Sequence, residues 1–270
     1  MRIVFFDSGV GGLTVLREAV RKLPSESYAY YADTLNVPYG VHSREEVYEF
    51  VVACIDDIMR SCEVKAIVIA CNTATSAAIE ELRDRYAFPI IGMEPAVKPA
   101  LQYVQQSGGR VLVTATPLTL KERKFQTLVR KLQSPEQVDT LGLPGLVEFA
   151  ERGVFGGPEV VAYLREQFAP FELQRYGAIV LGCTHFVFFR DSIREVVPPH
   201  VVLMDGNDGT VNQLIRVLGT NVRERAESAE GILFMSSKGT EEDKRKLSDF
   251  TDMTKYRYRA SARASQKRKG

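Results

Sequence analysis

The chain has 270 residues, a formal net charge of +1 and a hydrophobic fraction of 45%, which together indicate a globular protein with a sizeable core. It contains no apolar run of the roughly 18 residues that a membrane-spanning helix requires, and we expect no export because the chain begins almost directly with a predicted strand. Its four cysteines lack the spacing of a disulfide framework, so we expect a cytoplasmic protein that makes no contact with membranes.

Short apolar runs alternate with amphipathic stretches along the chain, and this alternation predicts strands and helices in turn. The predicted strands cover residues 2–6, 28–32, 66–70, 89–91, 110–114, 178–182, 201–204 and 232–235. Ser43 and Glu46 match a capping box, which predicts that a helix begins there. Strands that alternate with helices favour an α/β fold with mainly parallel sheets.

The first predicted strand ends in two polar residues, Asp7 and Ser8, and a glycine-rich turn follows in the stretch VFFDSGVGGLTVL. Such a turn can bind an anion, because free backbone N–H groups point outward at the start of a helix. Thr14 stands where a dinucleotide-binding motif requires glycine, and no P-loop lysine follows. We therefore expect Asp7, Ser8 and the neighbouring backbone to hold a small carboxylate or ammonium group rather than a nucleotide.

Two further strands end in a cysteine and have similar sequences. The stretch AIVIACNTATSAA contains Cys71, and the stretch AIVLGCTHF contains Cys183. This likeness suggests a weak internal duplication, and ligands of open α/β sheets lie at the carboxyl ends of the strands. We therefore expect two pseudo-symmetric α/β lobes with both thiols in the cleft between them.

Two crossovers between the lobes fit the sequence, one at Pro95–Pro99 and one near Gly206. They divide the chain into a first lobe of residues 1–95 plus 208–254 and a second lobe of residues 96–207. Residues 255–270 carry seven lysines or arginines and no acidic residue, which leaves a net charge of −6 for the rest of the chain. We expect this segment to be a disordered basic tail that is inert in catalysis, and contact with nucleic acid is the alternative.

Cysteines at strand ends are compatible with more than one kind of chemistry. A nucleophilic cysteine with a histidine base needs only Cys183 and His185, and it leaves Cys71 without a role. A redox dithiol usually has a CxxC spacing, which this chain lacks. Two thiols on opposite sides of a substrate can instead remove a proton from a carbon and return one to the other face, tuned by Asp7 and His185. The cysteines and histidines have no spacing typical of metal sites, so we expect no metal.

The segments FDSGVGGLTVL, ADTLNVPYG, ACNTATSAA and LGCTHF resemble, in this order, the signature segments of bacterial glutamate racemases of the aspartate/glutamate racemase superfamily. The resemblance extends from residue 3 to about residue 215. It implies two α/β lobes with the active site between them, and interconversion of L- and D-glutamate without pyridoxal phosphate or a metal. It also implies a homodimer and a supply of D-glutamate for peptidoglycan synthesis.

The resemblance further implies roles for individual residues in proton transfer. Cys71 would deprotonate D-glutamate with the help of Asp7. Cys183 would deprotonate L-glutamate with the help of His185. Glu151 falls where the family has a further acid near the second cysteine.

Several positions leave alternatives open. Glu148 competes with Glu151 for the position of the further acid. The residues that match substrate-holding positions are Ser8, Tyr39, Gly40, Asn72, Thr73, Thr116, Thr119 and Thr184. Thr116 and Thr119 could instead only start a helix over residues 117–132, and Tyr39 and Gly40 could form a plain turn.

The resemblance also leaves alternatives for the function. An aspartate racemase or another isomerase of the superfamily would share the fold, because substrate length cannot be read from the sequence. Some relatives are known to bind DNA gyrase, so an added contact with gyrase or nucleic acid is a second alternative. The sequence departs from the family at Phe186–Val187, where Tyr-Pro is usual.

Overall fold

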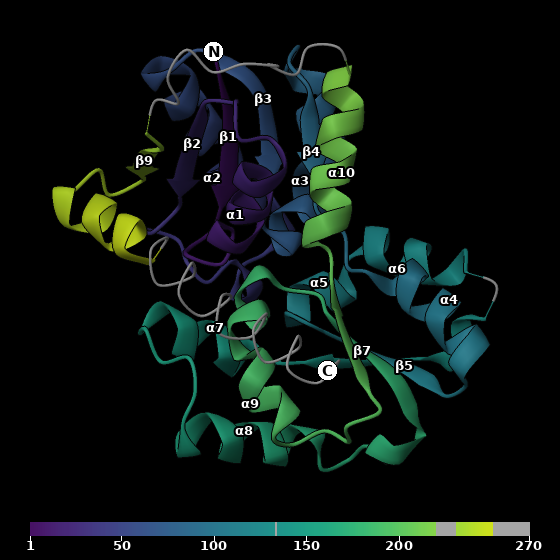
Figure 1. The fold of residues 1–270 in the computed structure, drawn as a ribbon. Helices are drawn as coiled ribbons and strands as arrows, with labels where there is room; N and C mark the ends of the chain where they lie inside the picture. Colours follow the sequence, from purple (N-terminus) through teal and green to yellow (C-terminus); the bar gives the residue numbers. More distant parts are fainter. Residues whose placement is uncertain (133, 220–230, 251–270) are drawn as a thin grey trace.

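The computed structural model describes residues 1–132, 134–219 and 231–250, and the predicted tail of residues 255–270 lies outside them. The strands form two sheets, and every paired strand runs parallel to its neighbour. The first sheet has the order β4 (Ile90–Gly92), β3 (Val64–Ile69), β1 (Arg2–Asp7), β2 (Tyr28–Ala32) and β9 (Leu233–Ser236). The second has the order β6 (Val138–Gly142), β5 (Arg110–Ala115), β7 (Tyr176–Leu181) and β8 (Val202–Asp205). These sheets confirm the predicted α/β class (Figure 1).

Helices cover both faces of each sheet. The α-helices are α1 (Leu13–Lys22), α2 (Arg44–Ser61), α3 (Asn72–Arg85), α4 (Val97–Ser107), α5 (Pro117–Lys121), α6 (Arg123–Arg130), α7 (Pro144–Glu151), α8 (Pro158–Phe168), α9 (Arg190–Arg194) and α10 (Asn207–Leu218). Short 3₁₀ helices are η1 (Tyr39–Val41), η2 (Pro135–Gln137), η3 (Leu173–Arg175) and η4 (Thr184–Phe189). Residues 241–250 are also helical.

Alternating side chains of β1 show why its sequence is a continuous apolar run. Ile3 and Phe5 pack with α1 on one face, whereas Val4 and Phe6 pack with α2 and α3 on the other. A strand that is buried on both faces needs apolar residues at every position. The same rule explains why the sequence pattern located the eight predicted strands to within two residues.

Two elements differ from the expectations. Strand β6 was not predicted, because all of its residues are only partly buried or exposed and its sequence VDTLG has no apolar run. The helix expected over residues 117–132 is two helices, and the chain is extended at Glu122 between them. This break allows Thr119 to face the region between the lobes while Phe125 packs into the core of the second sheet. The helix predicted from the capping box begins as expected, with Ser43 as the N-cap of α2.

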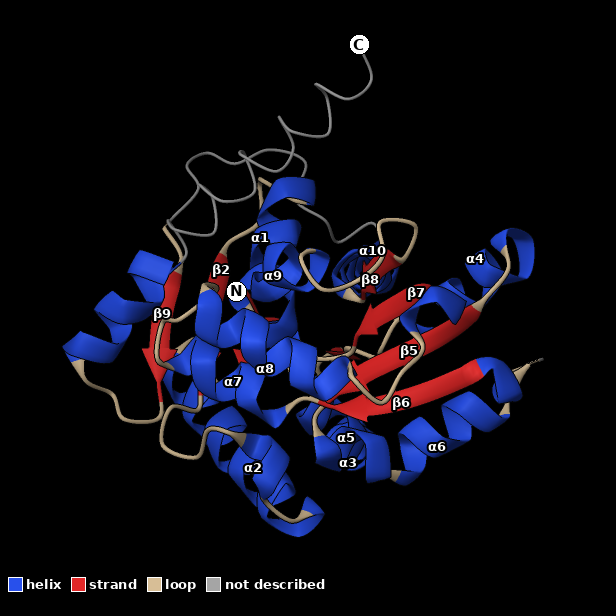
Figure 2. Ribbon diagram, turned by 90° about the horizontal axis from the view of Figure 1, so that it is seen from below, coloured by secondary structure: helices blue, strands red, loops and turns tan. Residues whose placement is uncertain are grey.

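The chain crosses between the two sheets at two adjacent points, after Gly92 and at Gly206. A Cβ atom at Gly206 would lie 2.7 Å from the carbonyl oxygen of Glu94, so the close approach of these two crossovers requires glycine. The strands of the second sheet point with their carboxyl ends toward the first sheet (Figure 2). The division into lobes of residues 1–95 plus 208–254 and residues 96–207 stays a prediction.

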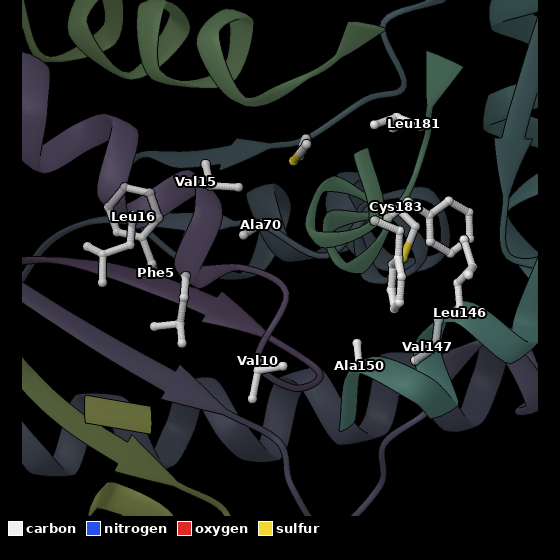
Figure 3. Close-up of a cluster of buried hydrophobic side chains, with 14 of the residues drawn as sticks. Phe5, Val10, Val15, Leu16, Ala70, Leu146, Val147, Ala150, Leu181 and Cys183 are labelled. Atoms are coloured by element: carbon white, nitrogen blue, oxygen red, sulfur yellow. The ribbon is translucent and has the colours of Figure 1, made fainter. Parts of the chain in front are cut away.

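A shared apolar core joins the two halves. One cluster of buried side chains contains residues of both sheets and of the helices between them (Figure 3), among them Phe5, Leu16, Ala70, Leu146, Leu181 and Cys183. The C-terminal segment adds to it, because β9 pairs with β2 while the ring of Phe250 packs edge-on against Phe155, 5.5 Å between centroids. None of the helices in the described part of the chain is long and apolar enough to cross a membrane.

Candidate functional site

A pocket of about 430 Å³, which includes space open to solvent, lies between the two sheets and is lined by both predicted thiols. Its lining includes eight of the predicted site residues, which are Ser8, Tyr39, Gly40, Cys71, Thr73, Thr116, Cys183 and His185. The other five do not line it; Glu151 and Thr119 bond to residues that do, Asp7 and Thr184 bond to each other, and Asn72 bonds to Met93. Five further lining residues, Pro38, Val41, Pro117, Pro144 and Val147, were not expected from the sequence, and Glu148 was expected only as an alternative acid.

Cys71 stands at the junction of β3 and α3 and is the N-cap residue of that helix. Its Sγ accepts a hydrogen bond from the backbone N–H of Ala74, at 3.4 Å, and lies 3.6 Å from Oγ of Ser8. Burial raises the pKa of the Cys71 thiol to about 12, and the nearby Asp7 carboxylate adds to the effect. At neutral pH this group is therefore a thiol and a proton donor.

Cys183 follows β7 and begins a chain of three side chains. Nδ1 of His185 lies 3.7 Å from Sγ of Cys183, and Nε2 of His185 donates to Oε1 of Glu151 at 2.7 Å. Burial by itself would lower the pKa of His185, but the bonds to Cys183 and Glu151 outweigh it and raise the pKa well above its usual value. The pKa of Glu151 is lowered although its burial acts in the opposite direction, because His185 donates to it. An imidazolium thus lies beside the second thiol.

The glycine-rich turn after β1 binds carboxylates, but they belong to the protein itself. The N–H of Gly9 donates to Oδ1 of Asp7 at 3.0 Å, and the N–H of Val10 donates to Oε1 of Glu151 at 2.9 Å. A Cβ atom at Gly9 would lie 2.0 Å from Oε1 of Glu151, so glycine is required for this contact. These two N–H groups are therefore not free for a ligand, contrary to the expectation from the sequence.

Asp7 is fully buried and bonds to Thr184, which follows β7 of the second sheet. The hydroxyl of Thr184 donates to its Oδ2 at 3.1 Å. Burial raises the pKa of the Asp7 carboxyl to about 6, against the opposing effects of His185 and of the hydrogen bonds. Because this value lies near neutral pH, the group can both accept and release a proton under ordinary conditions.

Three threonine hydroxyls meet where α3 and α5 begin. Oγ1 of Thr73 lies 2.9 Å from that of Thr116 and 3.1 Å from that of Thr119, and the last two are 2.9 Å apart. Thr116 also caps α5 by accepting from the N–H of Thr119, so the expected helix start and the expected site position are both present. The triangle joins the two lobes and offers neutral hydrogen-bond donors beside the pocket.

Tyr39 lines the pocket and Asn72 follows the lining residue Cys71, and the side chains of both bond within the protein. The hydroxyl of Tyr39 donates to Oδ2 of Asp33 at 2.6 Å, so this hydroxyl is engaged within the protein. Asp33 was not predicted as a site residue. It directly follows β2, much as Asp7 is the last residue of β1, and this position at a strand end could have identified it. The amide of Asn72 donates to the carbonyl of Met93 at 3.2 Å, and its buried Oδ1 has no partner among the described residues.

The structure separates the two acids that the sequence left as alternatives. Glu151 bonds to His185, whereas the side chain of Glu148 lines the pocket itself. The described residues contain no cluster of three or more histidine, cysteine or acidic side chains arranged to hold a metal ion.

Comparisons with known proteins agree with this geometry. The family model for Asp/Glu/hydantoin racemases matches residues 7–214. The chain is 48% identical over 256 residues to a glutamate racemase of Halothermothrix orenii, covering 94% of this chain and 99% of that protein. It is 52% identical over 218 residues to glutamate racemase 2 of Bacillus subtilis, covering 81% of this chain and 82% of that protein.

Solved structures are similar over nearly the whole fold. The glutamate racemase of Escherichia coli, in complex with L-glutamate and the activator UDP-MurNAc-Ala, has a TM-score of 0.80 at 29% identity, covering 93% of this chain and 96% of that one. The Francisella tularensis glutamate racemase in complex with D-glutamate has a TM-score of 0.77 at 27% identity, covering 93% and 92%.

Proposed function

The chain belongs to the Asp/Glu/hydantoin racemase family, and we propose that it interconverts L- and D-glutamate by proton transfer between the substrate and two thiols, Cys71 and Cys183. Relatives of which the chain covers most of the length are named glutamate racemases, and this supports glutamate as the substrate. We also propose that the D-glutamate formed is used in peptidoglycan synthesis, and that the protein acts as a cytoplasmic homodimer.

One observation carries the mechanism: two thiols at the ends of two separate strands line one pocket. In one direction, Cys183 removes the α-proton of L-glutamate, so that the Cα–H bond breaks and an S–H bond forms. The electron pair left on Cα then takes a proton from Cys71 on the opposite face, and the product is D-glutamate. The reverse reaction exchanges the two roles.

The electrostatics of the pocket match the protonation states that the reaction from L-glutamate requires at its start. Cys71 is held as a thiol by its burial and by Asp7, so it can donate a proton. Cys183, which removes the proton, lies 3.7 Å from Nδ1 of His185, and that imidazole has a raised pKa. Asp7, with a pKa of about 6, can take up the Cys71 proton when the reaction runs from D-glutamate. The two thiols thus have the same chemical role in opposite directions, but Asp7 assists Cys71 whereas His185 assists Cys183.

Neutral groups are proposed to hold the substrate. The hydroxyl triangle of Thr73, Thr116 and Thr119 can donate to a carboxylate. The unpartnered Oδ1 of Asn72 can accept from the substrate ammonium, which satisfies a buried polar atom. Because the lining contains no lysine or arginine and its His185 is paired with Glu151, we propose that hydrogen-bond donors stabilise most of the charge that develops on the substrate.

The direct test is chiral chromatography of the purified protein incubated with each enantiomer of glutamate or aspartate, with no cofactor added. We expect either enantiomer of glutamate to reach an equal mixture of both, and aspartate to react far more slowly. If aspartate is converted faster than glutamate, then aspartate is the substrate and the assignment of glutamate is wrong. The absence of any racemisation would contradict the proposal as a whole.

A further inference from the structure

Two acids lie one turn apart on the same face of α7 and have different surroundings. Pro144, Val147, Glu148 and Glu151 share this face, because their spacing follows the helical repeat. Glu151 is bonded to His185 and to the N–H of Val10. The side chain of Glu148 makes no hydrogen bond or ion pair with any residue that the structure describes, and it is exposed to solvent where it lines the pocket.

Glu148 therefore places a negative charge at the mouth of a pocket whose one cationic lining residue, His185, is already paired with Glu151. The lining residues include no lysine or arginine, and Glu148 is the single carboxylate among them. His185, the other charged group, is buried and already paired with Glu151. Any anion that binds here must therefore approach Glu148 without an unpaired cation in the lining to compensate.

We propose that Glu148 is a specificity-determining residue that selects α-amino dicarboxylates over dicarboxylates that lack the amino group. The inference rests on the proposed function and extends it to ligand charge. Glutamate has two carboxylates and one ammonium, and therefore a net charge of −1. A dicarboxylate of the same length without the ammonium, such as glutarate, has a net charge of −2 and is repelled more strongly.

The size of the effect follows from the charge. Repulsion between Glu148 and a ligand is proportional to the net ligand charge, so the fold-change in affinity for a dianion is the square of that for a monoanion. An exposed charge at the mouth of a pocket typically changes affinity by about threefold for a monoanion. We therefore expect Glu148 to weaken the binding of glutarate by about ninefold.

The experiment compares Glu148→Gln with the wild type at low ionic strength, by measuring KM for both enantiomers of glutamate and the inhibition constant of glutarate. We expect KM to fall by about threefold and the inhibition constant by about ninefold. Both differences should shrink in about 0.5 M salt, because mobile ions screen an exposed charge. Glu148→Asp should keep the wild-type constants, since it keeps the charge.

Glu195→Gln is the matched control. Glu195 is exposed and does not line the pocket, so this change alters the net charge equally without affecting the mouth, and both constants should stay as in the wild type. An increase in KM in Glu148→Gln, or equal effects of the two variants, would overturn the inference. A wild-type protein without racemase activity would instead overturn the proposed function.

Discussion

The carboxylate of Glu151 accepts a hydrogen bond from His185 at 2.7 Å, and its same oxygen accepts the N–H of Val10 at 2.9 Å. One side chain of α7 thus orients the imidazole beside Cys183 and at the same time binds the glycine turn that follows β1. Glu151 therefore both positions the imidazole next to Cys183 and helps to hold α7 against the turn after β1.

Replacing Glu151 by Gln should lower the pKa of His185, because the carboxylate that stabilises the imidazolium is removed. Protonated His185 is lost as the pH rises through its pKa. The alkaline limb of the kcat/KM profile should therefore move to lower pH by the same amount for both enantiomers, because their equilibrium constant is 1, and kcat should fall by about tenfold or more. The measurement is kcat/KM against pH in each direction.

Glu148→Gln is the control for this change, because it removes a carboxylate from the same helix face without a bond to His185. It should leave the alkaline limb in place. If Glu151→Gln also leaves that limb in place, the carboxylate does not support His185 in the proposed way.

The two thiols should fail in different half-reactions. In deuterated water, Cys71→Ser should lose exchange of the α-proton of D-glutamate, and Cys183→Ser should lose exchange of that of L-glutamate, because a serine hydroxyl is a far poorer base than a thiolate. Both variants should lose net racemisation, since each direction needs both groups. Proton NMR of each enantiomer over time measures the exchange.

Cys62→Ser is the matched control, because Cys62 ends α2 and does not line the pocket. It should racemise like the wild type. Full racemisation by Cys71→Ser or by Cys183→Ser would argue for a single base. So would a result in which one of these variants loses α-proton exchange of both enantiomers while the other loses neither.

Asp7→Asn should reduce turnover while stabilising the fold at neutral pH. The pKa of Asp7 is raised to about 6 from an ordinary value of 3.8, so the folded state binds the proton more tightly than the unfolded state. The stability cost of this carboxylate is therefore absent below pH 3.8, grows as the pH rises, and is complete above about pH 6. Its upper limit is about 3 kcal/mol.

Urea unfolding of both proteins tests this effect. The gain in the free energy of unfolding should be large at pH 8 and small at pH 4, while turnover falls by about 10² to 10⁴. Asn can still accept from Gly9 and contact Thr184, so the fold should survive. A gain of equal size at both pH values would mean that ionisation of Asp7 is not its cause.

Thr73→Val should weaken substrate binding more than it weakens the fold. Loss of one hydrogen bond to a charged carboxylate typically costs about 1.5 to 3 kcal/mol, which predicts an increase in KM of about tenfold or more. Thr75 offers a control on the same helix, because its hydroxyl donates to the carbonyl of Ile69 at 3.1 Å and accepts from Met93 at 3.0 Å. Thr75→Val should lower the melting temperature with little change in KM. If Thr73→Val and Thr75→Val change KM equally, the hydroxyl triangle does not bind the substrate.

Local patterns in the sequence were sufficient for much of the fold and for the main groups of the site. Buried parallel strands are continuous apolar runs, and polar residues follow where such strands end. Asp7, Cys71 and Cys183 could be recognised from this pattern alone, because the apolar run that forms the strand and the reactive residue at its end are adjacent in the sequence. The partly exposed strand β6 lacked such a run and was missed for the same reason.

The tertiary structure alone decided which side chains meet across the two halves. Glu148 and Glu151 lie on one helix face, and no local pattern tells which of them reaches His185, because that depends on how α7 docks against the turn after β1. The bond from Tyr39 to Asp33 likewise depends on how the chain folds back after β2. Sequence periodicity reports which face of an element is buried, whereas the partner on the other side is set by the packing of elements that are distant in the chain.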